Sequence, residues 1–163
     1  MSTPTLFLRR ARLSCAFLLL ATIATACGSD TEKASDPATD TYAASLGVNI
    51  AAMLKKADGL YYQDVIVGTG SDAIAGRTLT VTYTGWLTDG TQFDSNVGKA
   101  AFTVAPLGTA NVIAGWNIGL QGMKVGGKRR LAIGSGLAYG ATGSGTIGKN
   151  KTLVFDVILL SAQ

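Results

Sequence analysis

The sequence predicts an α+β domain in which several antiparallel strands are combined with one short helix. Threonines alternate with apolar residues over 77–87, the period of a half-buried strand. The segment 153–159 is apolar on both faces, as expected of a central strand. The 21 glycines among 163 residues suit a chain with many turns between such strands. Only 111–119 is a good candidate for a helix packed on the sheet.

The first 26 residues are expected to be a signal peptide rather than part of the fold. Three arginines precede 13–26, an apolar run of 14 residues that is shorter than the roughly 20 needed to span a membrane. Ala24-Thr25-Ala26-Cys27 resembles a bacterial lipobox, in which the cysteine is lipidated before cleavage. The sequence therefore predicts lipidation at Cys27 and a location outside the cytoplasm on a bacterial membrane. An ordinary signal peptide is the alternative.

Composition excludes several classes of chemistry. The chain has no histidine, and its only cysteines are Cys15 and Cys27, so neither a disulfide framework nor a Cys-based metal site can be built. Cleavage after residue 26 would remove three arginines and no acids, leaving 11 basic against 10 acidic residues. The mature chain therefore gives no reason to expect a nucleic-acid partner, and the basic run 128–130 is interpreted as a solvated strand or turn. No metal or cofactor is expected.

The mature N-terminus is predicted to precede the domain in two parts. Residues 27–41 carry the lipidated cysteine and a polar, acidic segment that is interpreted as a flexible tether. Residues 42–58 form an N-terminal extension with apolar residues at 46, 50, 53 and 54, a spacing compatible with a short helix. The regular domain is expected over 59–163.

The first half of this domain is predicted to contain strands and tight turns. A strand is expected over 60–67, and the alternating segment 77–87 ends at Asp89-Gly90, a strong hairpin signal. The return strand begins at 91–94. After a polar excursion, Phe102 and Val104 alternate again.

The predicted helix, 111–119, carries a tryptophan for which the sequence allows two roles. Asn111 is a plausible N-cap, while Val112, Ile113 and Trp116 share one face. Two glycines each lower helix propensity by about 1 kcal/mol relative to alanine, so packing on a sheet must hold the helix. A tryptophan in this position either fills the core or forms the floor of an apolar pocket.

The second half of the domain contains a long loop. Residues 124–127 are read as a tight turn, and 129–133 as a strand. The glycine-rich segment 134–150 includes Tyr139 and is longer than a simple connection requires, which is typical of functional loops.

Six motifs together resemble the FKBP-type peptidyl-prolyl cis-trans isomerases, the macrolide-binding immunophilins. The resemblance covers about 59–163 and is almost free of gaps. The motifs are Val81-Thr82-Tyr83-Thr84-Gly85-Trp86-Leu87, Asp89-Gly90, Phe93-Asp94-Ser95, Val112-Ile113-Ala114-Gly115-Trp116, Ala138-Tyr139-Gly140 and Thr152-Leu153-Val154-Phe155-Asp156-Val157.

The resemblance implies a twisted antiparallel sheet wrapped around the short helix, with a pocket between them. It implies an enzyme that accelerates isomerisation of X-Pro bonds in exported polypeptides, without a cofactor or metal. Implied partners are proline-containing chains and macrolides of the rapamycin and tacrolimus class. The implied catalytic residues are Tyr83, Asp94, Trp116, Tyr139 and Phe155, and the implied substrate-binding residues are Phe93, Phe102, Val112, Ile113 and Ile147.

Three departures from the family pattern keep other readings open. Val104 stands where a second aromatic is usual, 144–151 lacks the usual proline, and the excursion before Phe102 is about one residue short. The proline-free loop suits a proline-binding chaperone module with little turnover. A structural surface lipoprotein is a third reading, which the intact aromatic set argues against. Without the family, core packing would be the ordinary role for Tyr83 and Phe155.

Overall fold

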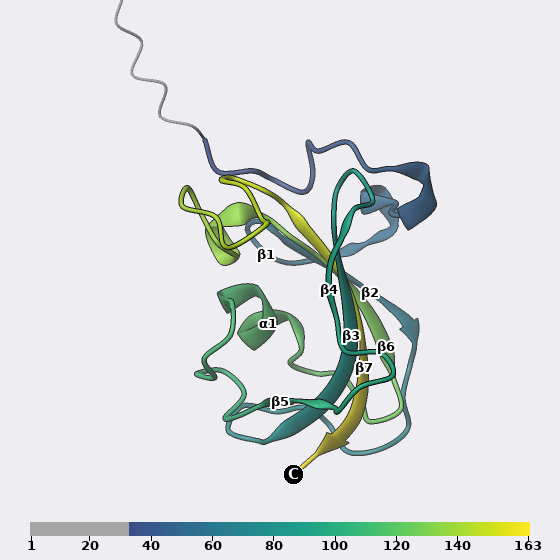
Figure 1. Ribbon diagram of the computed structural model, residues 1–163. Coiled ribbons are helices and arrows are strands. Elements are labelled where there is room, and N and C mark those ends of the chain that lie inside the picture. The colour runs from purple at the N-terminus through teal and green to yellow at the C-terminus, as the bar shows by residue number, and fades with distance from the viewer. Residues whose placement is uncertain (1–32) are drawn as a thin grey trace, which may run out of the picture.

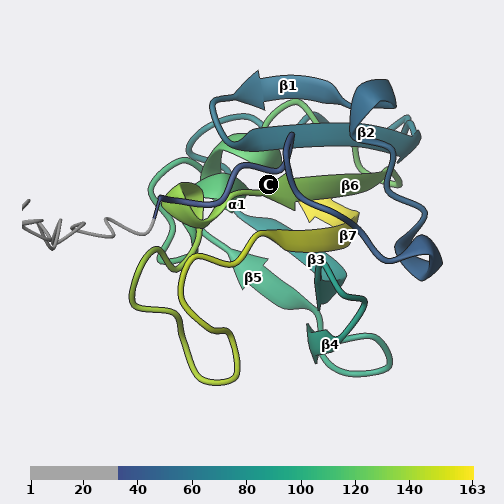
Figure 2. The same ribbon diagram turned by 90° about the horizontal axis from the view of Figure 1, so that it is seen from above.

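A computed structural model describes residues 33–163, which form an antiparallel sheet and one short α-helix (Figure 1). The sheet has the order β1-β2-β6-β7-β3-β4, and β5 pairs separately with β3 (Figure 2). The α+β architecture predicted from the sequence is therefore confirmed. The elements are β1 (Leu54–Ala57), β2 (Leu60–Ile66), β3 (Leu79–Leu87), β4 (Gln92–Ser95), β5 (Phe102–Val104), α1 (Ala114–Gly119), β6 (Lys128–Ile133) and β7 (Leu153–Ala162), with 3-10 turns at Ala44–Leu46, Ile50–Ala52 and Ser135–Leu137.

The hydrophobic core lies between α1 and the face of the sheet turned toward it. The closing strand β7 pairs with β6 on one side and β3 on the other, so the predicted central position of this apolar strand is confirmed. Alternate residues of β3, β6 and β7 enter the core, and α1 and the segment after it cover them. The core residues with no exposed surface include Leu60, Leu79, Val81, Val104, Leu120, Leu131, Ile133, Leu153, Val157 and Leu159.

Two glycines allow α1 to lie directly on β6. A Cβ atom at Gly115 would stand 2.4 Å from Ile133 Cγ2, and one at Gly119 would stand 2.9 Å from Leu131 Cδ2. The glycines that weaken the helix by propensity are thus required by its packing. The helix begins at Ala114 rather than at Asn111, because Ile113 is still extended (ψ 146°) and occupies the N-cap position. The predicted cap at Asn111 is therefore wrong, and no side chain caps the N-terminus of α1.

The N-terminal extension is not the helix that its apolar spacing suggested. It contains the two 3-10 turns Ala44–Leu46 and Ile50–Ala52, followed by the strand β1, which adds an edge to the sheet beside β2. The same apolar positions are used in part, since Leu46 and Met53 are each 7% exposed. Short turns satisfy this spacing as well as one amphipathic helix would.

Part of the segment expected to be a flexible tether packs on the domain. Ser35 exchanges two hydrogen bonds of 2.9 Å with Ser135, each residue donating its N–H to the other's hydroxyl. The Thr152 hydroxyl donates to Ser35 Oγ at 2.8 Å, and Pro37 is buried. The chain is thus fixed to the domain from about Ser35 onward. The predicted signal peptide and Cys27 lie outside the described residues; within 33–163, no helix is both long and apolar enough to cross a membrane.

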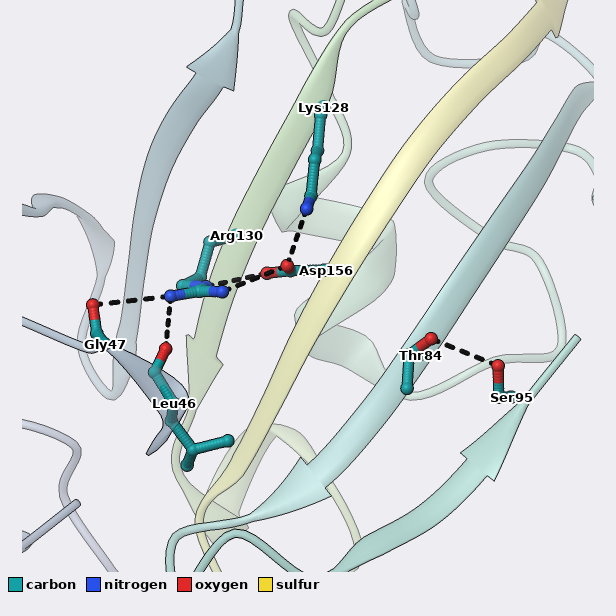
Figure 3. A network of polar contacts seen from close by, with 7 residues as sticks. All are labelled: Leu46, Gly47, Thr84, Ser95, Lys128, Arg130 and Asp156. Atoms are coloured by element: carbon teal, nitrogen blue, oxygen red, sulfur yellow. Dashed lines mark hydrogen bonds and ion pairs between the residues drawn. The ribbon is translucent and has the colours of Figure 1, made fainter. Parts of the chain in front are cut away.

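The basic run in β6 was expected to be solvated, and this expectation is wrong for Arg129 and Arg130. Arg129 has a side chain only 3% exposed and pairs with Asp64. On the opposite face, Arg130 and Lys128 both reach Asp156, and Arg130 also donates to the carbonyls of the N-terminal extension (Figure 3). Burial opposes ionisation of Asp156, but the hydrogen bonds from Arg130 and Lys128 hold the pKa of this carboxyl below its ordinary value.

Gly115→Ala is expected to destabilise the protein despite the higher helix propensity of alanine. The added methyl group would collide with Ile133, which is fully buried, so the cost of overpacking should be about 1–3 kcal/mol. Gly136→Ala is the matched control, because a Cβ atom there meets nothing within 4 Å. Urea denaturation of both variants measures the difference. Equal stability of the two variants would show that α1 does not depend on this close approach.

Candidate active site

An open cavity of about 240 Å³ lies between α1, the inner face of the sheet and the loop after β6. Nine of the ten residues that the sequence analysis assigned to catalysis or substrate binding line it, and Asn111 is the tenth lining residue. The lining residues are Tyr83, Phe93, Asp94, Phe102, Asn111, Val112, Ile113, Trp116, Tyr139 and Phe155. The structure thus brings together side chains separated by up to 72 positions in the sequence.

Trp116 forms the base of this cavity and holds the surrounding rings at right angles. Its indole is 4% exposed and lies edge-to-face with Tyr83 (5.0 Å between ring centroids, 86°), Phe155 (5.4 Å, 79°) and Phe102 (5.9 Å, 86°). Such T-shaped pairs are the favoured geometry for aromatic rings. The rings of Tyr83, Phe102, Trp116 and Phe155 therefore form an open aromatic cup rather than a closed core, because Phe102 at its rim remains 38% exposed.

Gly85 makes room for two of these rings, a role that strand periodicity alone does not reveal. A Cβ atom at this position of β3 would stand 2.6 Å from Phe93 Cζ and 2.8 Å from Phe155 Cε1. The two rings pack edge-to-face at 5.5 Å over the bare backbone of Gly85. Any other residue here would displace one of them from the wall.

The polar side of the cup is made by Tyr83 and Asp94 from the neighbouring strands β3 and β4. The Tyr83 hydroxyl donates a hydrogen bond of 2.5 Å to Asp94 Oδ2. Burial of the phenol, together with this bond and the nearby carboxylate charge, raises the pKa of Tyr83 above its ordinary value. Tyr83 is therefore a neutral donor throughout the physiological range, and Asp94 is the one formally charged group among the lining residues.

Two asparagines that the sequence analysis did not assign to the site hold its loops in place. Asn96 is 8% exposed; its carboxamide accepts from the N–H of Tyr83 (2.7 Å) and donates to the carbonyl of Val81 (3.1 Å). Asn117 in α1 accepts from the N–H groups of Gly108 (2.9 Å) and Ala110 (3.2 Å). They fix the segments on either side of the cup. Their only sequence signal is a polar residue amid apolar or glycine-rich neighbours.

The rim of the cup is partly open, and one predicted contact is absent from it. Tyr139, in the long loop, is 38% exposed and lines the cavity together with residues 111–113. Ile147 does not line the cavity; it is 7% exposed and belongs to the core cluster beneath the same loop. Val104, where a second aromatic was expected from the family pattern, is fully buried and also outside the cavity.

A family model and several known proteins match this chain, and all of them belong to one class. The family model described as FKBP-type peptidyl-prolyl cis-trans isomerase matches residues 70–160. An FK506-binding protein of Neisseria meningitidis serogroup B is 47% identical over 103 residues, which cover 63% of this chain and 94% of that protein. A peptidyl-prolyl isomerase FkpA of Aeromonas hydrophila is 47% identical, with 64% of this chain and 38% of that protein covered.

Solved structures of this class share the fold as well. The structure of FkpA from Escherichia coli superposes with a TM-score of 0.58 at 42% identity, covering 64% of this chain and 48% of that one. A peptidyl-prolyl isomerase from Pseudomonas syringae gives a TM-score of 0.61 at 36% identity, covering 68% and 80% respectively. The family match begins at residue 70, so β1, β2 and the N-terminal extension precede the matched region.

The raised pKa of Tyr83 predicts a specific loss of stability in alkali. Below about pH 10 the phenol is protonated in both folded and unfolded chains, so its contribution is fully present. As the pH rises further, the unfolded chain releases this proton first, and the free energy of unfolding falls until the folded phenol ionises as well. Tyr83→Phe should therefore reduce the loss of stability between about pH 9 and pH 11.

Urea denaturation at these two pH values measures that effect. Tyr42, whose pKa is also raised by burial and by nearby acids, contributes a separate share, so the loss should be reduced rather than abolished. An unchanged alkaline slope in Tyr83→Phe would contradict the assignment of a half-buried phenol whose pKa is raised by burial and by its hydrogen bond to Asp94.

Proposed function

The chain belongs to the FKBP-type peptidyl-prolyl cis-trans isomerases, and we propose that it acts on exported polypeptides while anchored to a bacterial membrane by a lipid. The isomerase activity rests on the family, and one observation ties it to this molecule. The aromatic cup over Trp116 is open, apolar at its base and polar on one side. That shape suits a proline ring held against the indole with its amide beside Asp94 and Tyr83.

Prolyl isomerisation requires no covalent step from the protein. The barrier to rotation about a peptide bond is about 18–20 kcal/mol, because the amide loses its resonance as it twists. An acceleration of about 10³–10⁵ requires only about 4–7 kcal/mol of preferential binding of the twisted state. No bond is made or broken, so rigid packing and fixed dipoles suffice. A chain without histidine can supply both.

The apolar part of the cup would act through desolvation. The planar amide is its more polar resonance form, so removal of water and contact with the rings of Trp116 and Phe155 favour the twisted form. The T-shaped packing around Trp116 keeps this surface in place before the substrate arrives. Little reorganisation then accompanies the twist.

The polar groups of the cup would orient the substrate. In this proposal Asp94 holds the Tyr83 hydroxyl, and this pair faces the twisted carbonyl without transferring a proton. The Ile113 N–H, at the uncapped start of α1, and the Tyr139 hydroxyl would donate hydrogen bonds to the peptide backbone. Phe93, Phe102 and Val112 would enclose the neighbouring side chains.

The same cup would accept macrolides of the rapamycin and tacrolimus class. Several relatives are named as FK506-binding proteins. The cavity of this chain has the aromatic base, the Tyr139 hydroxyl and the Ile113 N–H expected for such a ligand. Because Ile147 lies outside the cavity, we expect weaker contact on that side.

A proline-binding chaperone with little turnover is the second candidate. The position of Ile147, buried under the loop instead of facing the cup, is the observation that favours it. With one apolar contact fewer, the cup could hold proline without enclosing the twisted amide. The two candidates differ in whether bound peptide is isomerised.

The proposed anchor depends on the N-terminal sequence. An apolar run of 14 residues ends at Ala26, and Cys27 follows with small residues before it. Six residues later the described chain begins, and Ser35 is already bound to the domain. A lipid at Cys27 would therefore hold the isomerase close to the membrane surface, where exported chains emerge.

Purified protein should accelerate cis/trans exchange of a proline tetrapeptide in a protease-coupled assay. Trp116→Leu should lower kcat/KM by about tenfold or more, equivalent to about 1.4 kcal/mol, because the floor of the cup is lost. Asp94→Val should lower it in the same direction. Trp86→Leu is the matched control, since this second tryptophan lies outside the cavity.

The outcomes of that assay separate the candidates. Peptide binding without turnover in the wild-type protein would favour the chaperone. Unchanged rates in both Trp116→Leu and Asp94→Val would contradict the assignment of the site.

Mass spectrometry of the mature protein tests the anchor. We expect an N-terminal Cys27 carrying acyl chains, and membrane fractionation that shifts to the soluble fraction in Cys27→Ser. An unmodified N-terminus at another residue would favour the ordinary signal peptide instead.

A further inference from the structure

The guanidinium of Arg129 binds the C-terminal end of the helix that carries Trp116. Its Nη1 donates to the carbonyls of Gly119 (2.7 Å) and Gln121 (3.0 Å), directly at the end of α1. The side chain is 3% exposed, although it is an arginine in the middle of a strand. Fully buried arginines are rare unless they are paired, so this placement calls for an explanation.

The helix needs such a contact because its sequence does little to stabilise it. It has six residues, two of them glycine, with no side-chain cap at its N-terminus and no basic residue in its last turn. Free carbonyls at a helix end require partners, and a cation there also interacts favourably with the helix dipole. Arg129 supplies both from the neighbouring strand β6.

The position of the guanidinium is itself fixed from the other side. Asp64 on β2 accepts two hydrogen bonds from it, 2.7 Å from Nε and 3.0 Å from Nη2. The ring of Tyr62 lies 4.4 Å from the guanidinium carbon, a cation–π contact. The group therefore has one orientation, and the carbonyls at the end of α1 are held relative to the sheet.

We infer that Arg129 is a positioning residue for the isomerase site, which it serves by fixing the last turn of α1 and hence the angle of the Trp116 indole. Only one helical turn separates the carbonyl that Arg129 binds from Trp116. Within this turn the Trp116 carbonyl accepts the N–H of Leu120, next to the Gly119 carbonyl that Arg129 holds. Displacement of this turn would tilt the indole away from Tyr83 and Phe155. The inference rests on the proposed function in so far as it concerns catalysis.

The adjacent arginine provides a matched control. Arg130 also makes a two-point contact with a carboxylate, 2.7 and 3.0 Å from Asp156, but it lies on the opposite face of β6 with the N-terminal extension (Figure 3). Its hydrogen bonds and ion pair in the described structure go to Asp156, Leu46 and Gly47, none of which belongs to α1. The two residues therefore differ mainly in which face of the strand they serve.

The test compares Arg129→Met with Arg130→Met at a temperature where denaturation curves show both to be folded. We expect Arg129→Met to lower kcat/KM by about tenfold or more, as displaced groups commonly do, while Arg130→Met stays within about twofold. In a Trp86→Phe background, Trp116 emission should shift to the red only in Arg129→Met. Amide exchange at Leu120 should accelerate in the same variant.

Arg129→Lys covers the case in which Arg129→Met does not fold. Lysine can donate to a carbonyl of α1 but cannot also bind Asp64 in a fork, so we expect partial recovery of both activity and Trp116 emission. Loss of stability alone, with activity and Trp116 emission of the folded protein unchanged, would overturn the inference. If the wild-type protein shows no isomerase activity, the proposed function fails, whereas the emission and exchange measurements still decide the role of Arg129.

Discussion

The site depends on how closely a six-residue helix approaches one strand. Gly115 and Gly119 bring the backbone of α1 against Ile133 and Leu131 of β6, with no space for a methyl group at either position. This approach places Trp116 across the hollow of the sheet, where the rings of β3 and β7 can meet it edge-on. A helix with larger residues at these two positions would stand further from the sheet, and the indole would no longer form the floor of the cup. The two glycines that lower the helix propensity of α1 are thus the residues that allow the cup to form.

The alternation of side chains along the strands places the residues of the site on one face of the sheet and those that hold the N-terminal extension on the other. On the inner face, Tyr83 and Phe155 form the cup and Arg129 reaches the end of α1. Their neighbours Arg130 and Asp156 point to the outer face, where Asp156 accepts hydrogen bonds from Arg130 and Arg130 also binds the N-terminal extension (Figure 3). A strand changes face at each residue, so adjacent positions can serve attachment and chemistry without competing for space. The ionic groups collect on the outer side and at the helix end, and the cup keeps Asp94 as its single charge.

Local patterns in the sequence correctly predicted the strands and the turn whose conformation depends on neighbouring residues. The alternation over 77–87 and the apolar run 153–159 correspond to β3 and β7, and Asp89-Gly90 corresponds to the turn between β3 and β4, with Gly90 at a φ of 91°. The resemblance to the family predicted nine of the residues that line the cavity. The failures concern long-range partners. Arg129 was expected in solvent because Asp64, 65 positions away, is not visible as its partner in the sequence. Spacing alone could not separate two 3-10 turns from one helix in 42–58.

The loop 134–150 connects the N-terminal segment with the rim of the cup. Ser35 is bound to Ser135 at the start of this loop, and the Ser135 carbonyl accepts the N–H of Gly140, the residue after Tyr139. Gly140 in turn accepts the N–H of Asn150 at the other end of the loop. Within the described residues, the contacts of Ser35 therefore support the loop that carries a lining residue of the site. Ser35 lies outside the region shared with the family model, yet through these bonds it supports the loop that holds Tyr139 at the cavity.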